Sequence, residues 1–215
     1  KEEGLENRVD ARAFLKARLF DLVVGNWDRH QAQWRWARFG SEPVWVPLPE
    51  DADQAFTRYE GKAMGAVRRV VPRFMRYSGE YPKRMEGLTT NNYDVTRWLL
   101  ADVEWPVFEE VAREVQAALT DAAIDEAMRL MPPQWYAIDG AQLTKDLRQR
   151  RDGIVAYARK FYLHLADRVD VRATDKTDLA DVRHQPDGSL QLLLSPLNAD
   201  GTVARVRFFR YYPLV

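Results

Sequence analysis

The chain has 215 residues, of which 46% are hydrophobic and 30% are charged, an ordinary composition for a folded globular protein. Its 32 basic and 32 acidic side chains cancel, so the chain lacks the basic surplus that favours nucleic acid or an anionic membrane as the main partner. The absence of Cys excludes disulfides and thiolate metal sites, and no apolar run approaches the roughly 20 residues that span a bilayer. Because the sequence begins with Lys1 rather than Met, we expect it to be a piece of a longer protein.

The first predicted element is a helix in "RVDARAFLKARLFDLVVG", where apolar residues recur with helical spacing. Gly25 and Asn26 favour a left-handed helix end. Two short strands are predicted next, "WRWARFG" and "VWVPLP", around a "GSEP" turn. Trp34, Trp36 and Trp45 alternate with polar residues there, so we expect them to fill one face of the hairpin rather than to form a base-stacking platform.

Helices are predicted again after a looser stretch that is rich in Arg, Tyr, Gly and Pro and extends from residue 57 to about residue 88. "WPVFEEVAREVQAAL" carries Pro106 in its first turn, and "TDAAIDEAMRLM" begins with Thr120 as an N-cap and is stopped by two prolines. A long helical pattern then extends from Leu143 to Val169.

The sequence changes character after residue 170. Two turn signals, "PDG" and "NADG", separate short runs of β-branched and aromatic residues, which is typical of an antiparallel meander. We therefore predict an α+β fold, mainly helical, with a short β-hairpin and a C-terminal β meander. The predicted boundary near Val171 separates a helical domain, residues 1–170, from a β-rich appendage, residues 171–215.

Candidate site residues follow the first helix and the hairpin. In "LVVGNWDRHQAQWRW", Asp28 stands at the junction between the helix and the first strand, and Gln33 follows five residues later. Asp51 and Asp53 come just after the second strand and, two residues apart, point to the same face if the segment is extended. The intervening hairpin brings the ends of these elements together. Such oxygen donors suit a divalent cation of the Mg²⁺ type, which keeps room for phosphate oxygens.

"NWDRHQAQ" together with "PEDADQAF" resembles the catalytic and metal loops of atypical protein-kinase-like families. These include the spore-coat CotH kinases, the HipA-type toxin kinases and the secretory-pathway casein kinases. The CotH type is the most similar, because it has an Asp-x-Asp pair and a later basic helix segment comparable to "LRQRRDGI". More closely, the run from Asn26 to Asp178 resembles poorly characterised bacterial envelope proteins in which a kinase-like segment precedes a β-rich part.

This resemblance implies a role for each residue of the two loops. Asp28 takes the place of the catalytic base, and His30 supports it. Gln33 stands where the family has a metal-binding Asn, while Asp53 takes the metal-ligand position with Asp51 as its companion. The implied reaction transfers the γ-phosphoryl group of ATP to an unidentified hydroxyl acceptor, with Mg²⁺ or Mn²⁺ held by Asp53, Asp51 and Gln33. The implied location is the bacterial cell envelope or the secreted fraction.

The chain departs from the family pattern in two respects. Gln33 is one methylene longer than the usual Asn, which shifts or weakens a second metal. Nothing matches the Gly-rich loop over the nucleotide phosphates or the strand Lys that pairs with them. Those parts belong to an N-terminal lobe, expected before Arg8 in the whole protein, so the resemblance covers a C-terminal lobe that we expect to be inactive alone.

Two other classes of function remain open. One is an inactive pseudokinase or structural module that couples neighbouring domains of an envelope protein. The other is a metal-dependent phosphoesterase. Such sites usually use several His as well as Asp, whereas this sequence has only three His, of which only His30 lies near the acidic residues. His164 and His184 are assigned no role.

Two basic stretches also allow two interpretations each. The cations between residues 68 and 84 are interpreted as a solvated face, with an acidic or phosphorylated partner as the alternative. "RQRR", residues 148–151, is expected to face solvent or to pair with acidic residues of neighbouring helices.

Overall fold

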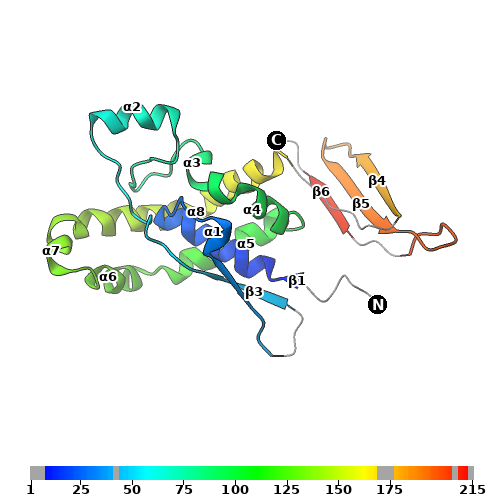
Figure 1. Ribbon diagram of the computed structural model, residues 1–215, viewed down its shortest axis with the longest axis horizontal. Helices are drawn as coiled ribbons and strands as arrows, with labels where there is room; N and C mark the ends of the chain where they lie inside the picture. The colour runs from blue at the N-terminus through cyan, green and yellow to red at the C-terminus, as the bar shows by residue number, and fades with distance from the viewer. Residues whose placement is uncertain (1–7, 41–43, 169–176, 205–207, 213–215) are drawn as a thin grey trace.

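The computed structural model describes residues 8–40, 44–168, 177–204 and 208–212 and is a mainly helical α+β fold, as the sequence predicts (Figure 1). Its elements in chain order are β1 (Arg8–Val9), α1 (Ala11–Val24), η1 (Gln31–Gln33), β2 (Trp34–Ala37), β3 (Val44–Pro49), α2 (Lys62–Val70), α3 (Glu86–Thr89), η2 (Thr90–Asn92), α4 (Tyr93–Leu99), α5 (Trp105–Ala118), α6 (Asp121–Arg129), α7 (Pro133–Trp135), η3 (Tyr136–Gly140), α8 (Ala141–Ala166), β4 (Asp178–His184), β5 (Leu190–Pro196) and β6 (Phe208–Tyr212).

Helices α1, α5 and α8 pack against one another and form the core of the helical part (Figure 1). Phe14 and Leu22 of α1, Phe108 of α5, and Ile154 and Phe161 of α8 are all at most 1% exposed. Removing such apolar surfaces from water is the main favourable contribution to folding. Among the described residues, no helix combines the length and the apolar character needed to cross a membrane.

Helix α1 begins and ends with the caps that its sequence indicates. Asp10 accepts a hydrogen bond from the backbone N–H of Ala13, which satisfies one free donor of the first turn. Gly25 closes the helix with a φ of +71°, a left-handed conformation that favours glycine. A Cβ at this position would lie 2.8 Å from the ring of Tyr77, so close packing also requires glycine.

The hairpin β2–β3 packs on the N-terminal half of α1. The two strands are antiparallel, with Trp34 opposite Pro49, and β1 adds to the far edge of β3 in parallel. Trp34 is buried, and its ring centroid lies 4.7 Å from that of Phe14 and 6.1 Å from that of Trp36. Trp34 and Trp36 therefore pack on α1 from the inner face of the hairpin. Trp36 and Trp45 are both half-buried, and Trp45 lies beside the Arg38 guanidinium.

Strands β4, β5 and β6 form the predicted antiparallel meander, drawn from orange to red in Figure 1. The turn at Asp187 and Gly188 joins β4 to β5, and Asp187 accepts hydrogen bonds from the backbone and the hydroxyl of Ser189. These bonds lower the pKa of the Asp187 carboxyl. The predicted domain boundary near Val171 lies outside the described residues.

The structure differs from the sequence-based expectation between residues 57 and 100. The stretch expected to be loose contains α2 and α3, and α4 follows it, although no helix was predicted there. Helix α2 buries none of its residues, and α3 and α4 have only four and seven residues. Helices α3 and α4 are too short to show a helical period, so their contacts with the rest of the chain decide their conformation. In α2, the Gly and Arg residues of "GKAMGAVRRV" favoured a loop over the helix that the structure contains.

The interpretation of "RQRR" as a solvated or ion-paired segment is correct for two of its arginines and wrong for a third. Arg148 and Arg151 pair with Asp121 and Asp125 near the start of α6. Arg150, in contrast, is fully buried. It points to the opposite side of α8, because residues two apart on a helix lie on different faces.

Candidate functional site

A buried ion-pair network holds the loop Asn26–His30 at the end of α1. Arg29 donates from Nε and Nη2 to both carboxylate oxygens of Asp21, at 3.0 and 2.9 Å. Asp21 also accepts from Arg18 at 2.8 Å and from the Asn26 side chain at 3.2 Å. The three charged residues are at most 4% exposed, so the positions of their side chains are fixed relative to α1.

Arg29 also joins this loop to the end of the hairpin. Its Nη1 donates to the backbone carbonyls of Gln33 and Glu50. The backbone N–H of Glu50 in turn donates to the carbonyl of Gln33 at 2.9 Å. One arginine side chain thus connects the helix, the loop that carries Asp28 and the start of the segment that carries the two later aspartates.

We call the segment Glu50–Gln54 the acidic loop. Its first aspartate, Asp51, contacts Gln33. The Gln33 amide is buried and donates from Nε2 to Asp51 Oδ2 at 3.2 Å. Asp51 Oδ1 accepts from the backbone N–H of Asp53 at 3.1 Å, and both aspartates are exposed. The φ of Asp51 is +57°, a left-handed conformation that Asp tolerates better than most residues.

A second chain of hydrogen bonds reaches Asp53 from the other side. The hydroxyl of Tyr59 donates to Gln54 Oε1 at 2.9 Å, and Gln54 Nε2 donates to Asp53 Oδ2 at 3.1 Å. Within the described ranges, Asp53 Oδ1 accepts no hydrogen bond. Asp53 therefore has one oriented oxygen and one oxygen available to a ligand.

Asp28 has a different partner from these aspartates. It is half-buried, and its Oδ1 accepts from the side chain of Asn91 in η2 at 2.6 Å. Arg29, which could have neutralised Asp28, pairs with Asp21 instead. His30 contributes its backbone N–H to Gln33 Oε1 at 3.4 Å. The structure thus joins His30, Gln33, Asp51 and Asp53 in one chain of contacts, and it joins Asp28 to η2.

Arg150 secures the same junction from α8. Its guanidinium donates to the carbonyls of Leu22 and Ser78, at 3.1 and 2.6 Å, and lies 4.1 Å from the ring centroid of Tyr77. Burial lowers the pKa of Arg150 and raises that of Tyr77 above its ordinary value of 10, so the phenol stays neutral beside the cation. Arg150 consequently holds the end of α1 against Tyr77 and Ser78, which follow the acidic loop in the chain.

The donor set fits a hard divalent cation held through two carboxylates and ligand oxygens. The part of the chain that is described contains no group of three or more His, Asp or Glu that could hold a metal ion. Mg²⁺, however, is commonly bound by one or two carboxylates, with phosphate oxygens and water filling the remaining positions. Asp51 and Asp53 offer these two carboxylates, and Gln33 offers an amide oxygen if its side chain turns over.

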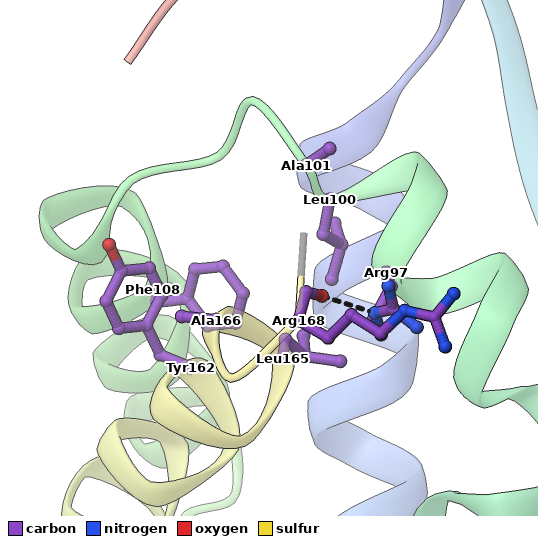
Figure 2. A pocket seen from close by; sticks show the side chains of 8 residues that line it. All are labelled: Arg97, Leu100, Ala101, Phe108, Tyr162, Leu165, Ala166 and Arg168. Atoms are coloured by element: carbon purple, nitrogen blue, oxygen red, sulfur yellow. Dashed lines mark hydrogen bonds between the residues drawn. The ribbon is translucent and has the colours of Figure 1, made fainter. Parts of the chain in front are cut away.

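A hollow elsewhere in the helical part is too small for a nucleotide. It lies where the ends of α4 and α8 meet α5, and Arg97, Leu100, Phe108 and Tyr162 contribute to its lining (Figure 2). Its volume is about 20 Å³, which is room for a single water molecule. The Arg97 side chain closes one side by donating to the Arg168 carbonyl at 2.6 Å.

Comparison of the chain with known proteins finds no match, because no family model, no curated protein and no solved structure aligns with it significantly. The roles of the site residues therefore rest on their geometry and chemistry.

Sequence reasoning missed four residues that shape the site, namely Asp21, Arg29, Asn91 and Arg150. For Asp21 a signal was present, because it follows Arg18 by three residues within a helix whose neighbouring positions are apolar. A charged pair at this spacing inside an apolar stripe indicates a buried ion pair. Asn91 and Arg150 contact partners more than 60 residues away, and no local pattern reveals such contacts.

Proposed function

We propose that this chain carries the metal-binding and acceptor-orienting half of a phosphotransferase site, which acts on ATP and a hydroxyl acceptor with Mg²⁺ or Mn²⁺. A single observation supports this best: hydrogen bonds link Gln33, Asp51 and Asp53, and the buried ion pair of Asp21 and Arg29 fixes the loop and the hairpin end that carry them. A rigid support under exposed carboxylates is what charge neutralisation in phosphoryl transfer requires.

Each residue has a role that its environment supports. Asp53 and Asp51 would hold the cation, which when bound neutralises charge on the transferring phosphoryl group. Gln54 and Tyr59 would keep Asp53 oriented through their hydrogen bonds. Asp28 would accept a hydrogen bond from the acceptor hydroxyl with its second oxygen, while Asn91 fixes the first.

The test compares binding of Mn²⁺–ATP and phosphoryl transfer in the full-length protein before and after Asp53→Ala. We expect calorimetric binding to disappear and turnover to fall by at least about 100-fold, because the variant removes a charge that acts in the transition state. Asp102→Ala is the matched control, because Asp102 is an exposed aspartate far along the chain from the loop and should change neither quantity. Binding and turnover that survive Asp53→Ala would contradict the proposal.

The second candidate is an inactive module of an envelope or secreted protein, and one observation favours it. The 2.6 Å bond from Asn91 occupies Oδ1 of Asp28, so only the second oxygen of this carboxylate is left for an acceptor. Asn91→Ala separates the two functions. In an active enzyme it would change turnover with little effect on Mn²⁺–ATP binding, whereas in a structural module it would change only stability.

A further inference from the structure

A groove opens in the segment that follows the acidic loop, between α2 and the start of α3. Its volume is about 370 Å³, which is enough for a few side chains of an extended peptide. Apolar surface in the groove comes from Pro72, Met75 and Pro82. The groove therefore offers apolar contacts as well as charge.

The other lining residues are four cations: Arg68, Arg76, Lys83 and Arg84. Two acidic side chains of the described residues pair with these cations. Glu60 pairs with Arg76 at 3.1 Å, and Glu86 lies 3.8 Å from Arg84.

The positive charge of the groove is therefore incompletely neutralised. The side chains of Arg76 and Arg84 remain 60% and 62% exposed, so both can still bind a second partner. Lys83 is exposed and pairs with no acidic residue of the described chain. Arg68 donates to the carbonyl of Tyr59 at 2.7 Å, which fixes its direction without neutralising it. A negatively charged ligand is favoured here although the net charge of the whole chain is zero.

The groove is connected to the candidate site by an aromatic cluster. Tyr59, whose hydroxyl orients Asp53 through Gln54, lies 5.1 Å from Phe74 between ring centroids. Trp27, the neighbour of Asp28, lies 6.1 Å from the same Phe74 ring. The guanidinium of Arg73 lies 5.8 Å from Trp27 and 5.4 Å from Phe74. Arg73 and Phe74 stand in the chain between Pro72 and Met75 of the groove, so this cluster links the groove to the segments that carry Asp28 and Asp53.

We propose that this groove binds an acidic peptide segment with an apolar residue at its centre. Apolar lining between cations complements such a peptide, with carboxylates meeting Lys and Arg and an apolar side chain covering Met75 and the prolines. None of the described residues that line the groove is aromatic, so they offer no platform for stacking nucleic-acid bases. Val67 and Val70 of the adjoining α2 are exposed beside its basic residues, so an anionic membrane is the competing partner that the vesicle experiment below tests. The further idea that this peptide carries the hydroxyl acceptor rests on the proposed function. Binding of the peptide to the groove does not depend on it.

The experiment is fluorescence anisotropy of the full chain with a short synthetic peptide of glutamates around one leucine and one serine. The same peptide with glutamines in place of glutamates is the ligand control. We expect the double variant Lys83→Glu/Arg84→Glu to weaken binding by about tenfold or more, because two attractive charge contacts become repulsive. Binding should also weaken with added salt, less steeply in the variant.

Arg129→Glu/Lys145→Glu is the matched control variant, because it changes the net charge equally at exposed positions of α6 and α8. It should bind the peptide as the unchanged chain does. Asp53→Ala without nucleotide should also keep peptide affinity, so a failed phosphotransferase test and a failed groove test remain distinguishable.

Three results would overturn the proposal: no binding of the acidic peptide, equal binding of the glutamine peptide, or equal weakening by the control variant. It would also be wrong if phosphatidylserine vesicles or a single-stranded oligonucleotide bound more tightly than the peptide and lost affinity in the Lys83→Glu/Arg84→Glu variant.

Discussion

The two regions that meet at the candidate site use their charges in opposite ways. At the end of α1, Arg18, Asp21 and Arg29 are buried, and Asp21 accepts from both arginines. In the acidic loop, Asp51 and Asp53 are exposed, and no cation pairs with either of them among the described residues. The first region uses charge to fix the chain in place, whereas the second leaves charge available to a ligand.

This difference indicates which part of the site is scaffold and which part is reactive. Buried charges are costly unless they are paired, so the α1 network can be kept only if every member stays in place. Exposed carboxylates contribute little to stability and can therefore be retained for chemistry. Substitutions should separate these two classes clearly, and the expected effects below run from the largest to the smallest.

Asp21→Ala should cause the largest loss. It leaves the guanidinium groups of Arg18 and Arg29 buried without a counter-charge, and removing one partner of a buried pair costs about 3–5 kcal/mol. Urea denaturation followed by circular dichroism would measure the free energy of unfolding. Asp53→Ala is the matched substitution in the exposed region and should stay within about 0.5 kcal/mol of the unchanged chain. Equal losses in the two variants would remove the distinction between the regions.

Arg150→Met should cost somewhat less, about 2–4 kcal/mol. Methionine keeps much of the volume in the core but leaves the carbonyls of Leu22 and Ser78 without their donor and removes the cation beside Tyr77. Arg151→Met, one residue along α8 and paired with exposed Asp121, should cost at most about 1 kcal/mol. The same denaturation measurement checks both values. A larger loss for Arg151→Met would mean that surface pairs, not the buried junction, hold α8 in place.

These two arginines also show how far the sequence predicts the fold. The helical period placed α1, α5 and α8, and the caps at Thr120 and Gly25 agree with the observed helix ends, because both signals are local. The contrast between Arg150 and Arg151 depends on which side of α8 faces the end of α1, and a run of four polar residues does not specify that.

The candidate site shows the same limit. The spacing of Gln33 and Asp51 around the hairpin allowed their proximity to be anticipated, because an antiparallel pair returns the chain to its starting point. The bond between Asn91 and Asp28 depends on how η2 packs on the loop. Non-local packing of this kind is not encoded in any short motif. The catalytic roles of Asp28, Asp51 and Asp53 stay predictions.

The smallest expected effect is a pH dependence of stability that arises next to η2, the helical turn whose Asn91 donates a hydrogen bond to Asp28. Thr89 and Tyr93 flank η2, and both contact His164 of α8: the Thr89 hydroxyl lies 3.3 Å from Nε2, and the Tyr93 hydroxyl donates to the His164 carbonyl at 3.0 Å. Burial lowers the pKa of His164 below its ordinary value of 6.5, and the nearby Arg97 lowers it further, although Glu86 and Asp167 act in the opposite direction.

A histidine with a lowered pKa makes the folded state less stable in acid. The unfolded chain takes up a proton near pH 6.5, while the folded chain does so only at lower pH, so stability is complete above about 6.5 and falls as the pH decreases below it. Because the ring is only half-buried and solvent screens its charge, the loss between about pH 7.5 and about pH 5 should stay below about 1 kcal/mol. His164→Gln should remove this part of the pH dependence, and His184→Gln in exposed β4 should leave it unchanged. Denaturation curves at the two pH values would test this. An unaltered pH dependence in His164→Gln would contradict the prediction. It would show that the other contacts of η2 hold it in place, so that the support of Asp28 does not depend on protonation of His164.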